Sequence, residues 1–369
     1  MKKDSTSFYI LQVSDFHISE ESRECAINAL HALTSKLKKM GIRISYLIHT
    51  GDIINSKDIE SKIEQEYGKD ITDEEYDKYL DGIVSERLEI AKAIMNDFIR
   101  ELDIVQKNVV ICCGNHDKVR YRKKKVAFEQ FEQFLSQVCS HTKLTALHEL
   151  DDLRILVLNT NISDDKKVTC VDCTNLKDVL NIDPLKEEPM NWFYTYDKNV
   201  KASEENEKVN IIVAHQPLYD ICEHIRLPYE SETQTTDFLS ALQDFINGNG
   251  IYLCGDKHTS SIAATYIHDI PHYFCGHPFV FEETRLPTGC MHEKLPKPQS
   301  VEIDYNLIEV RDGKTGQVRK LHLSKNNYKP WECEIHPIDA IVSSLYEKSR
   351  NYIVRNSFAL LATQSGTRL

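Results

Sequence analysis

The 369-residue sequence has no run of about 18 consecutive apolar residues, the length that a membrane-spanning helix requires. Its first residues, Met1 to Ser5, lead directly into a predicted strand and lack the apolar stretch of a signal peptide. We therefore expect a cytoplasmic protein that does not associate with membranes. Internal repeats and low-complexity segments are absent as well, and with 41% hydrophobic residues the chain can bury a large core.

Positive charge is also in short supply, since 45 Lys and Arg face 57 Asp and Glu for a formal net charge of −12. This balance disfavours a protein that coats duplex nucleic acid, because such binding uses many Lys and Arg contacts to phosphates, but it leaves a local phosphate site open. The eleven cysteines are an odd number and suit reduced core thiols better than a disulfide framework. Cys170 and Cys173, with Cys290 and His292, could form a structural zinc site, although loop cysteines are the simpler interpretation.

Five short apolar segments stand out because each ends in potential metal ligands. Apolar runs of four to six residues, rich in Val, Ile and Leu, are typical of buried strands, and open α/β folds place their sites just past strand ends. A single His or Asp beside a strand is more often a turn residue, but five such clusters predict side chains that converge on a metal centre. In chain order the clusters contain Asp15 and His17, then Asp52, then Asn115, His116 and Asp117, then His215, and finally Asp256 and His258.

The remaining pattern predicts one domain over residues 1–330 and a helical tail over 331–369. We expect strands at 8–14, 43–49, 109–113, 153–159, 209–214, 251–254 and 272–275, a hairpin at 301–310 and 317–323, and helices at 22–40 and 236–247. A charged helical insertion is predicted at about 55–105 and an irregular insertion at about 160–208. The apolar tail would either pack on the core or lead into a partner protein or a further domain.

The five clusters resemble, in order and residue type, the calcineurin-like metallophosphoesterase superfamily, whose pattern is Asp-x-His, Gly-Asp, Gly-Asn-His-Asp or -Glu, a lone His, and Gly-His-x-His. The resemblance spans residues 8 to about 323 and is closest in motif style to DNA-repair exonucleases and cyclic-nucleotide phosphodiesterases. It implies an α/β fold, the four-layer α-β-β-α metallophosphoesterase sandwich with two mixed β-sheets flanked by helices.

The resemblance also implies a site for two divalent metal ions. One metal would be held by Asp15, His17, Asp52 and His258, and the other by Asp52, Asn115, His215 and Asp256. Two cations roughly 3.5–4 Å apart need a bridging carboxylate, which agrees with the place of Asp52 in both sets. A hydroxide activated by the two metals would attack phosphorus, and His116 would stabilise or protonate the leaving oxygen. Asp117 either takes part in catalysis or only holds the loop.

Two positions depart from the family pattern. The family's Gly-His-x-His is here Gly255-Asp256-Lys257-His258, so a carboxylate replaces an imidazole in the second metal set. Hard oxygen ligands favour Mn²⁺ or Mg²⁺ over Zn²⁺, and we expect Mn²⁺, with Mg²⁺, Zn²⁺ or Fe as alternatives. Asn55 stands where several members carry an Asp or His that orients the catalytic histidine. Six other histidines match no ligand position, and we treat them as surface or loop residues: His49, His224, His268, His272, His277 and His292.

These features favour a metal-dependent phosphodiesterase or nuclease that acts on nucleic acid or nucleotides. The basic run Lys118 to Lys125 follows the active-site loop directly, and we expect its residues Arg122, Lys123, Lys124 and Lys125 to contact substrate phosphates; a solvated helix start is the alternative. Bacterial anti-phage defence proteins use this domain as a nuclease effector, which is a further hypothesis. A phosphomonoesterase of small metabolites and a non-catalytic scaffold with a degenerate metal site remain open.

Overall fold

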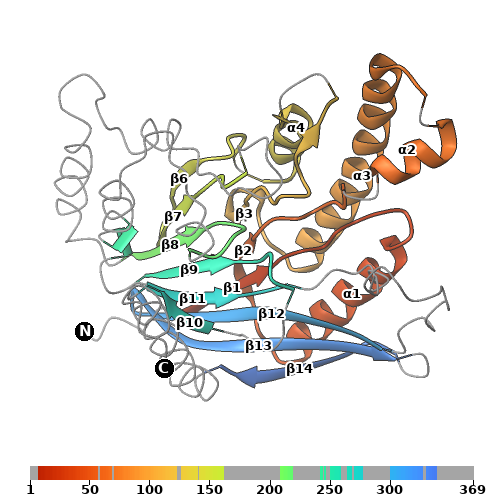
Figure 1. Cartoon of the computed structure of the whole chain (residues 1–369). Helices are drawn as coiled ribbons and strands as arrows, with labels where there is room; N and C mark the ends of the chain where they lie inside the picture. Colours follow the sequence, from red (N-terminus) through yellow and green to blue (C-terminus); the bar gives the residue numbers. More distant parts are fainter. Residues whose placement is uncertain are drawn as a thin grey trace, which may run out of the picture.

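The structure is a computed structural model that describes residues 7–56, 59–68, 70–122, 126–139, 141–161, 208–218, 242–243, 245–246, 250–258, 264–267, 270–276, 300–326 and 330–338. Its strands form two large sheets that face each other (Figure 1). The predicted α/β class with two mixed β-sheets and flanking helices is confirmed.

The first sheet has the strand order β14-β13-β12-β1-β2-β3. Its parallel part consists of β1 (Ser7–Val13), β2 (Ile44–His49) and β3 (Val109–Ile111), and its antiparallel part of β12 (Ser300–Arg311), β13 (Lys314–Asn326) and β14 (Glu332–Pro337). Helix α1 (Arg23–Lys39) makes the crossover that a parallel β1–β2 pair requires. Three parallel strands therefore end at the same edge of this sheet.

The second sheet has the order β10-β11-β9-β8-β7-β6. Its parallel strands are β7 (Leu153–Val157), β8 (Val209–Val213), β9 (Ile251–Cys254) and β11 (Ile270–Phe274), while β6 (Ala146–Glu149) and β10 (Ala264–Ile267) pair antiparallel at its two edges. On its outer face, Phe245 lies under the guanidinium of Arg154 from β7, 5.6 Å from the ring centroid. Residues 242–243 and 245–246, inside the helix expected at 236–247, are helical.

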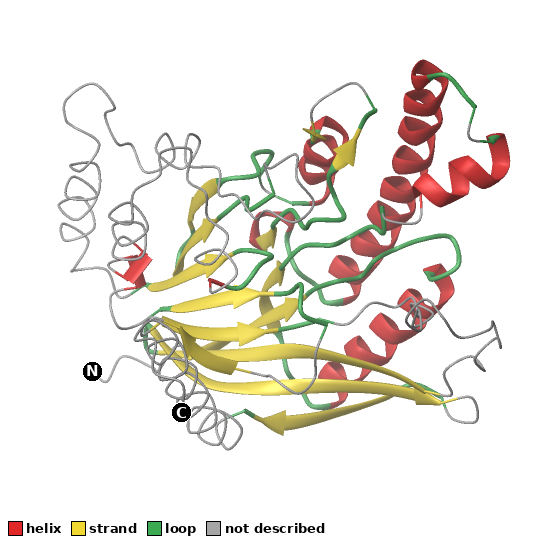
Figure 2. Ribbon diagram, in the orientation of Figure 1, coloured by secondary structure: helices red, strands yellow, loops and turns green. Residues whose placement is uncertain are grey.

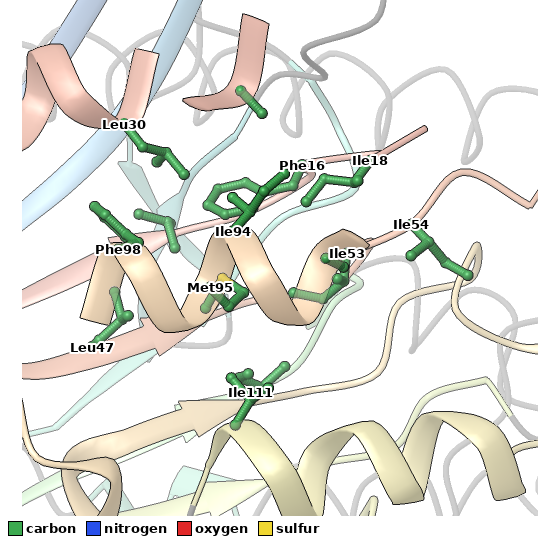
Figure 3. Packing of buried hydrophobic residues seen from close by; sticks show 14 of the residues in the cluster. Phe16, Ile18, Leu30, Leu47, Ile53, Ile54, Ile94, Met95, Phe98 and Ile111 are labelled. Carbon is green, nitrogen blue, oxygen red and sulfur yellow. The ribbon is translucent and has the colours of Figure 1, made fainter. Parts of the chain in front are cut away.

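The charged insertion forms two helices, α2 (Ile59–Tyr67) and α3 (Asp73–Glu101), followed by the short 3₁₀ helix Gln106–Asn108. Thr72 and Glu75 begin α3 with a capping box, in which each side chain bonds the other residue's backbone N–H. The apolar stripe of α3 packs on the first sheet, and Figure 3 shows Ile94, Met95 and Phe98 facing that layer. In Figure 2 the described helices α1 and α3 run along the outer side of this sheet.

Alternate residues of the central strands enter two different cores. Leu11 and Leu47 pack against the helices, whereas Ile10 and Ile48 pack between the two sheets. Because both faces of these strands are buried, the sequence shows continuous apolar runs and not an alternating pattern. The two cores hold the strand ends, and the loops that follow them, in fixed positions.

Two expectations are wrong, and others fall outside the described residues. The predicted helical tail begins too early, since Glu332–Pro337 is strand β14, paired with β13; residues beyond 338 lie outside the described part. His49 and His272 are not surface residues, because both are fully buried in sheet strands.

Other expectations fall on residues outside the described part of the chain. These are most of the insertion at 160–208, the Cys170–Cys173 pair, and the remaining four of the six histidines that match no ligand position. No described helix is long and apolar enough to cross a membrane.

A candidate metal centre at the strand ends

Every predicted ligand lies directly after a parallel strand. Strands β1, β2 and β3 of the first sheet present the loops at residues 14–17, 50–55 and 112–117, and β8 and β9 of the second sheet present those at 214–216 and 255–258. The backbones of the first two loops are tied together, because Asp15 N donates to Gly51 O at 2.9 Å and His17 N to Asp52 O at 3.0 Å. The five clusters therefore meet at one place, as the sequence predicts.

The backbone at these ligands is unusual. Asp15 and His17 have φ values of 55° and 46°, and Asp256 and His258 repeat the pattern with 67° and 46°. Asp52 also has a positive φ, 56°. Non-glycine residues seldom adopt this conformation, and when several cluster they usually mark a functional site. The two Asp-x-His segments, from different sheets, thus share one ligand-presenting geometry.

Two glycines allow the loops to approach one another. A Cβ atom on Gly114 would lie 2.0 Å from Oδ1 of Asp52, and one on Gly51 would lie 2.6 Å from Nδ1 of His215. No side chain fits at either position. Their place next to the candidate ligands explains the Gly-Asp and Gly-Asn-His-Asp motifs in steric terms.

The first predicted metal set is assembled. Asp15, His17, Asp52 and His258 each offer a ligand atom, and these atoms lie within 4.8 Å of one another. Nε2 of His17 is 3.1 Å from Nε2 of His258, which is 3.0 Å from Oδ1 of Asp15. Apart from His258, these side chains are buried. Two imidazole nitrogens and two carboxylates converging in this way fit a divalent cation.

Asp52 lies between the two predicted sets. Its Oδ2 is 3.4 Å from Nε2 of His17 and 3.2 Å from Nε2 of His215, while its Oδ1 accepts the backbone N–H of His116 at 2.8 Å. One carboxylate oxygen is therefore held by the protein, and the other is left between the two histidines. This is the position that a bridging ligand occupies.

The second set gathers around His215. Its Nδ1 is 2.8 Å from Thr50 O, which directs Nε2 into the site, 3.5 Å from Oδ1 of Asp256. The amide oxygen of Asn115 lies 3.1 Å from this Nε2 and 3.0 Å from Oδ2 of Asp52. The Asn115 amide oxygen thus faces two other acceptor atoms, Nε2 of His215 and Oδ2 of Asp52. Either a rotated Asn115 amide, which would donate to both atoms, or a cation between the three would make the contacts favourable. The donor set fits a second divalent ion.

The electrostatics keep the acids of the site charged. Burial alone would raise the pKa of Asp15, but hydrogen bonds from His17 and His258 hold it below its usual range. Burial likewise opposes ionisation of Asp52, yet the neighbouring His215 and His116 hold its pKa well below the ordinary value. The pKa of His215 is raised by the same Asp52 charge despite burial. The imidazoles beside Asp15 and Asp52 therefore favour the charged form of both carboxylates.

Asp117 holds the loop. Its Oδ2 accepts from the backbone N–H groups of Asp52 at 2.9 Å and Gly114 at 2.8 Å, and its Oδ1 accepts from that of Ile54 at 3.1 Å. Both oxygens are thus occupied by backbone donors. Burial and the nearby Asp52 charge raise the pKa of Asp117 to about 7. Of the two roles left open by the sequence, the geometry supports the positioning role.

His116 and Asn55 form the predicted pair. Nδ1 of His116 is 3.1 Å from Oδ1 of Asn55, and Nε2 lies 3.9 Å from Oδ2 of Asp52. The sequence analysis missed the next member, Arg87 of α3, which is buried and whose Nη1 donates to the Asn55 carbonyl oxygen. An arginine in a charged helix carries no pattern that marks it as buried. The insertion helix therefore contacts the loop that carries Asn55, the partner of His116.

The basic run is not a helix start. It enters a small hairpin of β4 (Val119–Arg120) and β5 (Val126–Ala127), before helix α4 (Glu129–Val138). Arg122 lies against α3, where Nη1 is 3.7 Å from Oδ1 of Asp73 and its backbone N–H donates to Asp77 at 3.1 Å. Lys123, Lys124 and Lys125 lie outside the described residues. The expected phosphate contacts of all four residues stay a prediction.

Comparison with known proteins gives one family and several distant structural similarities. The family model described as calcineurin-like phosphoesterase matches residues 8–277. No curated protein matches the sequence.

Three solved structures are similar to the chain at low identity. A single mutant of Vps29 from Entamoeba histolytica is 11% identical, with a TM-score of 0.31 over 89% of this chain and 99% of that one. GAP50, the anchor in the inner membrane complex of Plasmodium, is 10% identical, with a TM-score of 0.37 over 90% and 89%. The NAD nucleotidase NadN of Haemophilus influenzae is 12% identical, with a TM-score of 0.30 over 90% of this chain and 50% of that one.

Proposed function

The chain belongs to the calcineurin-like phosphoesterase family, and on that premise we propose that it is a phosphodiesterase or nuclease that hydrolyses nucleic acid or nucleotides with two divalent cations, Mn²⁺ being preferred. The observation that carries the proposal is the position of Asp52, whose Oδ2 lies between His17 and His215, the imidazoles of the two ligand sets. When bound, two such cations supply a nucleophile from water at neutral pH and neutralise charge on the phosphoryl oxygens.

The chain's own residues would orient this chemistry. Asp52 is fixed by the backbone N–H of His116, so its free oxygen cannot rotate away from the two histidines. The Asn55 side chain faces Nδ1 of His116, so Nε2 would be the nitrogen that acts on the leaving oxygen. Because Asn55 is neutral, it positions the imidazole without stabilising its charged form.

A diester substrate is supported by the charge distribution. The chain as a whole is acidic, yet six of the eight residues from Lys118 to Lys125 are basic and follow the Asn115–Asp117 loop. A polyanionic substrate would pass this segment on its way to the metals. Action as an effector in bacterial anti-phage defence is a wider hypothesis that would use the same nuclease activity.

The test is a substrate panel assayed with Mn²⁺, Mg²⁺ or Zn²⁺. It contains single-stranded and duplex DNA, RNA, cyclic nucleotides, a chromogenic phosphodiester and a chromogenic phosphomonoester. We expect metal-dependent hydrolysis of the diesters, strongest with Mn²⁺. Activity on the monoester alone would select the phosphomonoesterase, and no activity on any substrate would select the scaffold.

A His116→Ala variant separates chemistry from metal binding. It should bind metal normally, because His116 belongs to neither ligand set, and lose roughly 10²-fold or more in turnover. Exchange of the half-exposed His336 for Ala is the matched control and should not change turnover. Unchanged turnover of His116→Ala on a substrate with a poor leaving group would remove this residue from the mechanism.

A further inference from the structure

A polar pocket lies between the β4–β5 hairpin and the helices α2 and α3. Its volume is about 300 Å³, and it is lined by Glu64, Tyr76, Arg120, Tyr121 and Arg122. None of these residues belongs to the two metal sets. Two arginines and a single carboxylate line the pocket, and this balance of charge suits an anion.

The two arginines have different surroundings. Arg122 already has partners within the protein. Its Nη1 donates to the Ile71 carbonyl oxygen at 3.2 Å and lies 3.7 Å from a carboxylate oxygen of Asp73. Its guanidinium also lies over the Tyr76 ring, 4.2 Å from the ring centroid. For Arg120, in contrast, Nη2 is buried and has no hydrogen-bond partner among the residues that the structure describes. Buried donors without an acceptor are rare in folded proteins, because losing water without replacement is costly.

We propose that this pocket binds a phosphate group, with Arg120, which lines it and whose Nη2 has no partner among the described residues, as its main contact. In the reaction, this phosphate would belong to the substrate chain, a short distance from the bond that is cut. The identity of the substrate rests on the proposed function, whereas the anion site itself does not. Arginine suits this role because its planar donor fork matches two phosphate oxygens.

The place of the pocket along the chain supports a substrate role. Arg120 follows Asp117 by three residues, and Asp117 accepts the backbone N–H of Asp52. Three residues span at most about 11 Å between Cα atoms, so Arg120 is close to the candidate centre. A polynucleotide carries one phosphate per nucleotide, so one chain can place phosphates in the pocket and at the candidate metal centre at once.

Substitution of Glu64 tests whether the ligand of the pocket is negatively charged. Its carboxylate also lines the pocket and would repel a phosphate there. Glu64→Gln should therefore strengthen the binding of a phosphate ligand, whereas it would weaken the binding of a cation. Arg120→Gln should have the opposite effect on the phosphate ligand. Opposite changes from two residues of one pocket cannot arise from general loss of structure.

Stability provides an independent readout. A structural arginine stabilises the fold, whereas an arginine with a buried nitrogen that lacks a partner carries a desolvation cost that a bound anion would relieve. We therefore expect Arg120→Gln to have a Tm equal to or above that of the wild type. Arg43→Gln is the matched control, because Arg43 has a highly exposed side chain and precedes β2, at the opposite end of that strand from Asp52.

The experiment measures binding by the full chain, loaded with Mn²⁺, of a short single-stranded oligonucleotide with hydrolysis-resistant phosphorothioate linkages. Relative to Arg43→Gln, we expect Arg120→Gln to bind about tenfold more weakly and to flatten the slope of log affinity against log salt by about 0.7, as for one lost contact to a single strand. Glu64→Gln should bind more tightly than the wild type. Competition by inorganic phosphate is measured in parallel, and an Arg120→Gln variant that loses phosphate binding but keeps oligonucleotide binding would point to a small phosphate compound as the natural ligand.

Two results would overturn the inference. Arg120→Gln could bind the oligonucleotide and phosphate as well as Arg43→Gln does, or it could lose several degrees of Tm, which would make Arg120 a structural residue. Hydrolysis of the chromogenic diester by the wild type is scored separately. A failure there would remove the proposed function, while the binding differences would still decide the anion site.

Discussion

The two carboxylate oxygens of Asp52 have different roles. Oδ1 accepts a backbone N–H from His116, and Oδ2 faces His17 and His215. We predict that Asp52→Asn lowers kcat by roughly 10²–10³-fold or more and removes the rise in Tm that Mn²⁺ causes, because an amide cannot bridge two cations. The measurement is a diester assay together with thermal unfolding, each with and without metal.

The matched control for this substitution is Asp103→Asn. Asp103 has the same left-handed backbone, with a φ of 56°, but its side chain is exposed and is paired with Arg43 on the surface. It should leave both kcat and the metal-induced rise in Tm unchanged. Near-normal turnover of Asp52→Asn would disprove the two-metal account.

Asp256 is the residue that departs from the family pattern. Its Oδ1 lies 3.5 Å from Nε2 of His215, and its backbone φ of 67° resembles that of His258, a histidine that tolerates the same region. We predict that Asp256→His stays active and shifts its metal preference from Mn²⁺ toward Zn²⁺ or Co²⁺, because an imidazole replaces a hard oxygen ligand. Activity profiles across these metals provide the measurement. An unchanged profile would mean that Asp256 does not contact the metal.

Among the elements, the edge strand β3 depends on a pair of histidines, the buried His141 and the partly buried His148. The backbone N–H of Ile111 donates to Nε2 of His141 at 3.2 Å, and His148 of β6 packs against the His141 ring with centroids 4.6 Å apart. Burial, with a smaller contribution from His141, lowers the pKa of His148 to about 4. Burial also lowers the pKa of His141. The fold therefore holds both rings neutral.

This pair predicts a loss of stability in acid. The unfolded chain binds a proton at His148 below about pH 6.5, whereas the folded chain does so only near pH 4, so the unfolding free energy falls as the pH falls through this window. We predict that His148→Phe abolishes about 1–2 kcal/mol of that fall, measured by denaturant unfolding at pH 7 and pH 4.5. His336→Phe, at a half-exposed position, should keep the wild-type dependence. An equal fall in all three proteins would contradict the assignment.

Helices and strands were predictable from the sequence where their burial in the core determines the pattern of apolar residues. Strand β9 has the expected bounds of 251–254, because a strand buried on both faces shows a continuous apolar run. The same logic predicted that the ligands of each sheet lie together, since parallel strands of one sheet end at one edge. The segment at 118–127 was harder, because its short hairpin is held by the acidic side chains of α3, Asp73 and Asp77, and not by local propensity. The buried Arg87 and the buried Nη2 of Arg120 could not be recognised, since burial of an arginine atom depends on tertiary contacts.

For the whole molecule, two sheets and the helices of one insertion define the candidate centre. The first sheet contributes Asp15, His17, Asp52 and Asn115, and the second contributes His215, Asp256 and His258. Helix α3 supports it from outside through Arg87. The centre is complete only when the sheets are packed together, so metal binding should stabilise the entire domain and not one loop.

The central claim is that the chain holds two divalent cations, and elemental analysis of the Mn²⁺-loaded protein after removal of free metal tests it most directly. The account predicts a value near two manganese ions per chain, because the ligand atoms form two sets that share Asp52. A value near one, or none, would contradict it.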